Sequence, residues 1–388
     1  MNQAICSRDQ RMLEIRPPVA AMPSRNPIRG RRPIGALIGA ILLLGAATLS
    51  RAHIIPLAEL VSGITMTPAQ CAALPQAVWV GVAGREFCIR YYLSAAGGEG
   101  TRPMVFLQGD RLGRLNLKTG EFALTARDKD IDTDDFVRIA DVLSKQTQGP
   151  AIYLARPGLD GSSGDHRIRH STLELIVTNA ALDAIKKRHR FDAFHMMGQS
   201  GGSILVGGML ALRTDIGCAV IGSGRLAHDK PTRRSTDPAS DYFDVVDAVG
   251  AIAKKPATRI LLVTDPLDKK VPEPTQTNFV RKLRHAGGQA DQLLVQATDD
   301  DRHGVIPYAR TAAVGCMRGA STQEIARDVE AHVEMRLAAK RAKQGQQASA
   351  AAVTATAAPN APWKPVCCRS WRRRRKSEPR SGLLAVPD

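Results

Sequence analysis

Residues 193–205, AFHMMGQSGGSIL, place one serine among glycines where an apolar run stops. A serine hydroxyl is a weak nucleophile until a base removes its proton and nearby donors stabilise the oxyanion that forms. A sharp turn from a buried strand into a helix can present such a hydroxyl, and the turn crowds its backbone so that glycine is needed two residues to either side. The sequence therefore predicts a nucleophile at Ser200, within the pattern Gly198-Gln199-Ser200-Gly201-Gly202.

Short apolar runs alternate with longer helical patterns through the middle of the chain. Strands are expected at 77–82, 87–94, 103–108, 151–155, 193–197, 217–222, 259–264 and 292–297. Helices are expected at 133–146, 171–189, 201–213, 274–286, 307–317 and 321–343. The first two strands have no helix between them, whereas the later alternation requires a parallel sheet covered on both faces. The predicted fold class is α/β, a mostly parallel eight-stranded sheet with helices on both faces and antiparallel strands at its N-terminal side.

An acid and a base must reach the Ser200 hydroxyl for it to react. The loop that follows the strand at 259–264 offers two carboxylates. Asp268 lies in the part of the loop where a side chain can project, whereas Asp265 is nearer to the strand end and suits a turn-shaping role. We therefore predict Asp268 as the acid, with Asp265 as the alternative.

Three histidines follow Asp268 along the chain. His285 and His332 lie in helical patterns with charged neighbours and are expected to face solvent. His303 comes just after the last predicted strand and before Gly304, on a loop. His303 is therefore the predicted base.

The serine, the acid and the histidine follow one another along the chain in the order found in the α/β-hydrolases. Over residues 77–335 the chain resembles that family. The features that carry this resemblance are the serine turn, the D-x-x-V-P loop around Asp268 and the histidine in the last loop. The resemblance, which is broadest to the peptidase and dienelactone-hydrolase-like branches, implies Ser200 as nucleophile, His303 as base and Asp268 as its orienting acid. It implies no cofactor and no metal.

The loop after the third strand, LQGDRLG at 107–113, supplies one oxyanion N–H in proteins of that family. The resemblance assigns this donor to Asp110 and the second donor to Gly201, the residue after the nucleophile. Gln108 stands here where the family usually has histidine, which makes the identity of the first donor less specific.

Further polar residues follow the fourth strand, in ARPGLDGSSG at 155–164. Its glycines and serines resemble a tight loop of the same family near the active site. Ser162 and Ser163 are expected to cap and turn the chain rather than to react. Arg156 either holds a substrate carboxylate or braces the loops, and we favour bracing.

One acidic stretch partly matches a calcium-binding loop. Asp128, Asp130 and Asp132 alternate like the first ligands of a calcium loop, but the positions for its glycine and last carboxylate hold Thr133 and Ile139. We expect Asp132 or Thr133 to cap a helix instead.

His166 and His170 have the four-residue spacing of a helical metal site. No third ligand is evident, and Arg167 and Arg169 would repel a cation.

The net charge of +17 lies almost entirely at the two ends of the 388-residue chain. Residues 1–52 carry +6 and residues 336–388 carry +10, which leaves +1 for residues 53–335. The folded part is thus close to neutral, and the run RRRRK at 372–376 is expected to be a solvated tail. We expect no specific nucleic-acid partner.

The N-terminus has the pattern of a secretory signal. Three arginines precede the apolar run at 33–50, and Ser50-Arg51-Ala52 places small residues where a signal peptidase reads them. The predicted organisation is a signal peptide or signal anchor at 1–52, the hydrolase domain at 53–343 and a disordered basic tail at 344–388. Cleavage after Ala52 gives a periplasmic or secreted protein, and retention of 33–50 would leave it associated with the inner membrane.

Seven cysteines are compatible with export. Cys71 and Cys88 flank the start of the fold and are candidates for a disulfide. Cys218 and Cys316 pair only if the fold brings them together, and a buried free thiol at Cys218 is an equal alternative.

These features together predict an exported serine hydrolase that cleaves a small ester or peptide-like amide through an acyl-enzyme. The alternative is a catalytically inactive protein of the same fold that binds ligands in the cell envelope.

Overall fold

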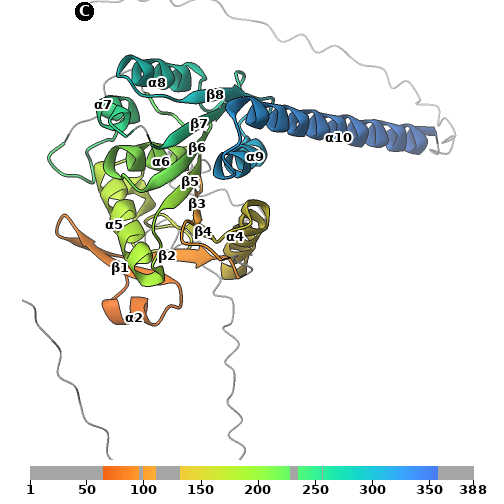
Figure 1. Ribbon diagram of the computed structural model, residues 1–388. Coiled ribbons are helices and arrows are strands. Elements are labelled where there is room, and N and C mark those ends of the chain that lie inside the picture. Colours follow the sequence, from red (N-terminus) through yellow and green to blue (C-terminus); the bar gives the residue numbers. More distant parts are fainter. Residues whose placement is uncertain (1–63, 96–98, 111–131, 228–234, 256, 357–388) are drawn as a thin grey trace, which may run out of the picture. The chain divides into compact units, whose positions relative to one another are not determined.

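The computed structural model describes residues 64–95, 99–110, 132–227, 235–255 and 257–356. Its eight strands form one sheet in the order β1-β2-β4-β3-β5-β6-β7-β8 (Figure 1). The strands are β1 (Ala77–Val82), β2 (Arg85–Leu93), β3 (Met104–Leu107), β4 (Ala151–Leu154), β5 (Phe194–Gln199), β6 (Ile216–Gly222), β7 (Arg259–Thr264) and β8 (Asp291–Leu294). The β1–β2 and β2–β4 pairs are antiparallel and all the others are parallel. This is an α/β-hydrolase-like sheet, and it confirms the predicted fold class.

Helices cover both faces of this sheet (Figure 1). One face packs on α5 (Thr172–His189), α6 (Gly201–Leu212), α7 (Val249–Ala253) and α8 (Pro274–His285). The other packs on α4 (Thr133–Thr147), α9 (Ile306–Met317) and α10 (Thr322–Thr356). A short helix, α2 (Pro68–Ala72), precedes β1.

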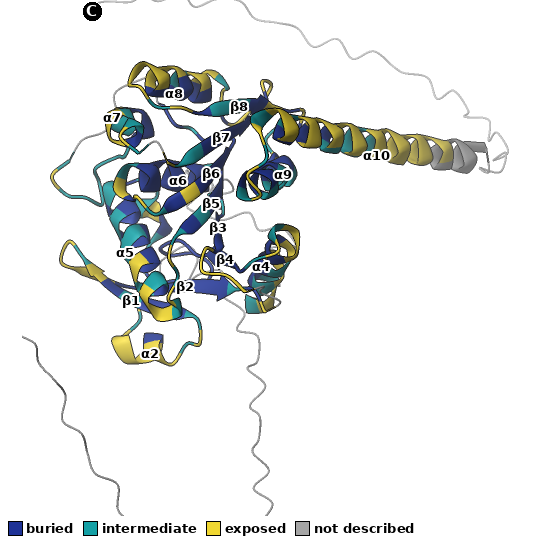
Figure 2. Cartoon of the chain, viewed as in Figure 1, coloured by how far each residue is buried: buried dark blue, intermediate teal, exposed yellow. Residues whose placement is uncertain are grey.

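The pleat of the strands explains how one sheet contributes side chains to two hydrophobic cores. Successive side chains of a strand point to opposite faces. In β3, Val105 and Leu107 belong to the core on the α5 and α6 side, whereas Met104 and Phe106 belong to the core on the α4 and α9 side. All four residues are buried, as Figure 2 shows for the central strands in general. A strand buried on both faces has to be apolar throughout, which is the pattern that the sequence shows.

Most of the predicted elements are found within a few residues of their expected ends. Helices α2 and α7 were not predicted, because five residues are too few to show a helical period. Helix α10 continues to Thr356, so the expected end at 343 is wrong, and residues 344–356 of the predicted disordered tail are helical. Residues 1–52 and 357–388 lie outside the described residues.

Two disulfides join distant parts of this fold. Cys71 pairs with Cys88, which links α2 to β2, and Cys218 pairs with Cys316, which links β6 to α9. The buried free thiol that was the alternative for Cys218 is therefore not observed. Across the described part of the chain, no helix is both long enough and apolar enough to cross a bilayer.

Candidate active site

Ser200 lies on the turn between β5 and α6, with a φ of 53° and a ψ of −120°. A positive φ is costly for a residue with a Cβ, on the order of 1–3 kcal/mol. The glycines on either side explain how the turn closes. A Cβ on Gly198 would lie 2.6 Å from the Gly202 carbonyl oxygen, and one on Gly202 would lie 2.1 Å from the Leu107 carbonyl oxygen. Any larger residue at these two positions would push the strand and the helix apart.

Asp268 and His303 meet at the same edge of the sheet. Asp268 follows β7, His303 follows β8, and their contact joins His303 Nδ1 to Asp268 Oδ2 at 2.8 Å and to Oδ1 at 3.1 Å. Asp268 Oδ1 also accepts from the backbone N–H groups of Lys270 and Val271 at 2.8 and 3.0 Å. Burial raises the pKa of the Asp268 carboxyl, but these hydrogen bonds outweigh it and the pKa is lowered. Asp268 is thus an anion that fixes the orientation of the imidazole.

Asp265, the competing acid, does not face His303. Its buried carboxylate accepts from Arg302 Nε and Nη2 at 2.6 and 2.9 Å and from the Ala297 N–H at 2.7 Å. These bonds tie the loop after β7 to the segment that leads to His303. Asp265 therefore shapes the loops, and Asp268 holds the histidine.

The serine turn and the histidine loop are tied together directly. The side-chain amide of Gln199, the residue before the serine, donates to the His303 carbonyl at 2.9 Å. The backbone N–H of Ser200 donates to the Gly222 carbonyl at 2.8 Å. A Cβ on Gly222 would lie 3.0 Å from both Gln199 Oε1 and Val305 Cγ2, so this glycine lets the β5 end approach the histidine loop. The carboxyl ends of parallel strands share one edge, and that edge carries all three predicted catalytic residues.

The loop after β3 lies against the serine. A Cβ on Gly109 would be 3.0 Å from Ser200 Cβ, and one on Gly201 would be 2.1 Å from Asp110 Oδ1. Asp110 and Gly201, the two predicted oxyanion donors, are therefore adjacent. The Asp110 carboxylate therefore lies against the start of α6, next to the turn that carries Ser200.

Arg156 forms an ion pair with Asp110. Its buried guanidinium donates to Asp110 Oδ1 at 2.7 Å, to the Gln108 carbonyl at 3.3 Å and to both oxygens of Glu174 at 2.8 and 3.1 Å. Burial alone would raise the pKa of Asp110, but Arg156 and then His170 outweigh it and hold the pKa far below its usual range. Removing one member of a buried ion pair typically costs about 3–5 kcal/mol. Arg156 thus braces the loop after β3, as expected, and its side chain is buried.

A second histidine completes this cluster. His170 Nε2 lies 2.9 Å from Asp110 Oδ2, and its Nδ1 lies 2.6 Å from the Tyr242 hydroxyl. Its backbone N–H donates to Glu174 at 2.7 Å. The sequence did not single out Glu174 or Tyr242, because their contacts join a loop, a helix and a distant segment. The one local feature that pointed to this cluster was Arg156, which directly follows an apolar strand.

The two serines of the loop after β4 have structural roles. Ser162 and Ser163 accept from the backbone N–H groups of Arg90 and Cys88 at 3.0 and 2.7 Å, which secures the edge of β2. Burial, and then Arg156, lowers the pKa of His166 well below its ordinary value, so its imidazole is neutral at pH 7. No cluster of three or more His, Cys, Asp or Glu side chains suited to a metal occurs among the residues that the structure describes.

The one described aspartate of the calcium-like motif, Asp132, caps a helix. Asp132 Oδ1 accepts from the N–H groups of Asp134 and Asp135 at 2.9 and 3.0 Å, which caps α4. Asp128 and Asp130 lie outside the described residues.

No protein-family description matches the sequence, and no curated protein matches it. Three solved structures show how far its likeness to known proteins extends. An esterase from Pyrococcus furiosus is 13% identical, with a TM-score of 0.45 over 66% of this chain and 97% of that one. Est1E from Butyrivibrio proteoclasticus, with ferulic acid bound, is 14% identical, with a TM-score of 0.42 over 63% and 98%. An acylaminoacyl peptidase from Pyrococcus horikoshii is 12% identical, with a TM-score of 0.40 over 63% and 39%. At these values the likeness assigns no activity to this chain.

The ionised Asp110 makes the stability of the protein depend on pH. A carboxyl whose pKa is lowered by folding stabilises the protein above its unfolded pKa, and this stabilisation is lost as the pH falls. We expect the free energy of unfolding to decrease from pH 5 to pH 3, and we expect D110N to make that decrease shallower. Urea unfolding at a series of pH values measures both slopes. E330Q, which removes an exposed carboxylate from α10, is the control for removing a carboxyl elsewhere; equal slopes for D110N and wild type would contradict the prediction.

Proposed function

We propose that this chain is an exported serine hydrolase that cleaves a small ester or amide. The observation that carries the proposal is the arrangement at one sheet edge: a serine with positive φ on a strand-to-helix turn, beside a loop whose histidine contacts a buried aspartate. Buried carboxylate–imidazole pairs of this kind serve serine nucleophiles on several unrelated folds. The loop after β3 and the start of α6 carry the two candidate oxyanion donors, Asp110 and Gly201.

The reaction follows from the roles of these groups. His303 takes the proton of the Ser200 hydroxyl as its oxygen attacks the substrate carbonyl, while Asp268 stabilises the imidazolium that forms. The backbone N–H groups of Asp110 and Gly201 stabilise the oxyanion of the tetrahedral intermediate. His303 then gives its proton to the departing alcohol or amine, which leaves an acyl-enzyme on Ser200. A water molecule, deprotonated by His303, attacks this ester, releases the acid and restores the serine.

Arg156 positions the loop after β3 and takes no part in the bond-making steps. It contacts both the Gln108 carbonyl and the Asp110 carboxylate, which are on either side of Gly109. Donors in an oxyanion hole contribute most when they are held in place before the charge develops. The buried pair of Arg156 and Glu174 supplies that rigidity, and it keeps the Asp110 charge from opposing the oxyanion.

A fluorophosphonate probe tests the proposal directly. Such probes phosphonylate an activated serine, so we expect the wild-type protein to be labelled once and S200A not to be labelled. S349A, which removes an exposed serine from α10, is the control and should be labelled like wild type. A folded wild-type protein that takes no label would instead support the inactive binding protein.

Export is the second part of the proposal, and two disulfides support it, because such bonds persist in oxidising compartments. When the full chain is expressed with its N-terminus intact in a bacterial host, we expect a periplasmic or secreted product that begins at His53. Mass spectrometry of the purified protein measures this N-terminus. A product in the membrane fraction that keeps residues 33–50 would show an anchor instead, and a reduced protein in the cytoplasm would contradict export.

A further inference from the structure

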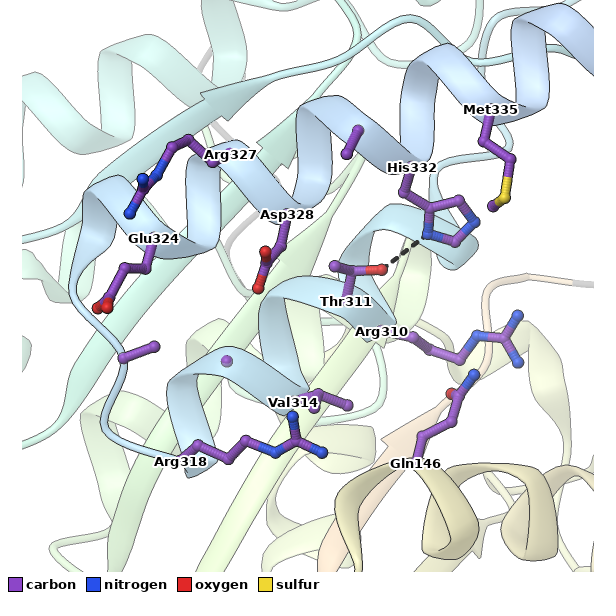
Figure 3. A pocket seen from close by; sticks show the side chains of 13 residues that line it. Gln146, Arg310, Thr311, Val314, Arg318, Glu324, Arg327, Asp328, His332 and Met335 are labelled. Atoms are coloured by element: carbon purple, nitrogen blue, oxygen red, sulfur yellow. Dashed lines mark hydrogen bonds between the residues drawn. The ribbon is translucent and has the colours of Figure 1, made fainter.

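A groove of about 1060 Å³ runs between α4, α9 and α10, on the sheet face opposite to α6 (Figure 3). Its walls include Gln146 from α4, Arg310 and Thr311 from α9, and His332 and Met335 from α10. None of these residues belongs to the serine site. The volume would hold a metabolite-sized molecule.

Arg310 is the unusual residue of this groove. Its Nε is buried and has no hydrogen-bond partner, and the same holds for the Nε of nearby Arg336. Burial and then Arg336 lower the pKa of Arg310, and no carboxylate among the described residues offsets them. A folded protein normally pairs a half-buried guanidinium with an acid. The neighbour whose charge acts on Arg310 is instead a second cation, Arg336, and of the two only Arg310 lines the groove.

The other polar groups are arranged around this charge. His332, which was expected to face solvent, is partly exposed, and its Nδ1 lies 2.8 Å from the Thr311 hydroxyl. Burial, followed by Arg336 and Arg310, lowers the pKa of His332, so it is a neutral hydrogen-bonding group at pH 7. Figure 3 shows the amide of Gln146 beside the Arg310 guanidinium.

The acids of the groove do not neutralise Arg310. The carboxylate of Glu324 is bound at the start of α10, where it accepts from the Ser321 N–H and hydroxyl at 2.7 and 2.8 Å. In Figure 3, Glu324 is drawn at the end of the groove away from Arg310 and Gln146. Among the described residues, neither Asp328 nor any other acid contributes to the pKa of Arg310. The excess positive charge is therefore local to the end of the groove near α4.

We propose that this groove binds a small molecule that carries a phosphate group, with Arg310 as its main ligand. A phosphate carries close to two negative charges and three acceptor oxygens, which matches the guanidinium of Arg310 and the amide of Gln146 beside it in the groove wall. Guanidinium groups bind phosphate through paired hydrogen bonds. The apolar side chains of Val314 and Met335, also in the groove wall, would contact the rest of the molecule.

The experiment uses the full-length protein and inorganic phosphate as the probe. The thermal midpoint is measured against phosphate concentration, with chloride added to keep the ionic strength constant. We expect a saturable rise for wild type, and at least a tenfold weaker apparent affinity for R310Q. R281Q, which removes an exposed arginine bonded to Asn278 on α8, is the matched control and should bind like wild type.

R310Q should fold, because it removes a repelled charge, and R310K provides a second variant that keeps the charge but loses the paired hydrogen bonds. R310K should bind with an affinity between those of wild type and R310Q. The proposal is overturned if the phosphate response does not saturate, or if it is the same in R310Q as in wild type. It is also overturned if acetate at the same ionic strength gives an equal response, because the groove would then recognise carboxylates as well as phosphates.

Discussion

The structure of the site depends on how closely the backbone can approach itself at the turn between β5 and α6. Side chains at Gly198 or Gly202 would overlap backbone atoms that are 2.1–2.7 Å away, and those atoms belong to the turn itself and to the end of β3. The missing Cβ atoms let Ser200 take its positive φ and let the loop after β3 lie against it. The sheet and its two cores over-determine this strained conformation, which is the condition under which strain persists at a functional position.

The aspartates around the site have different partners and therefore different roles. Of the two aspartates after β7, Asp268 faces His303, while Asp265 faces Arg302 and holds the loops. On the other side of the serine, Asp110 is adjacent to Gly201 and is held by Arg156. An ion pair buried this deeply contributes little net stability compared with apolar packing, but it fixes geometry. This network therefore fixes the position of the loop after β3.

The sequence alone predicts the parts of this fold that are local. Strands that are buried on both faces are apolar runs in the sequence. The glycines around Ser200 are required by backbone crowding within the turn itself, so they also form a local pattern. The contacts of Glu174 and Tyr242 could not be predicted, because they depend on how α5 and a distant loop meet at the sheet edge. The end of α10 was missed for another reason: its alanine-rich low-complexity sequence suggested disorder, whereas alanine is also the strongest helix former.

The central claim is that Asp268, and not its neighbour Asp265, orients His303 for attack by Ser200. Its most direct test compares the hydrolysis of p-nitrophenyl acetate by wild type, D268N and D265N, with circular dichroism to verify folding. We expect D268N to stay folded and to lose kcat by about 10²–10⁴-fold, because an amide cannot stabilise the imidazolium. D265N should lower the thermal midpoint, with a much smaller effect on kcat in the folded protein. A folded D268N with the wild-type kcat would contradict the account.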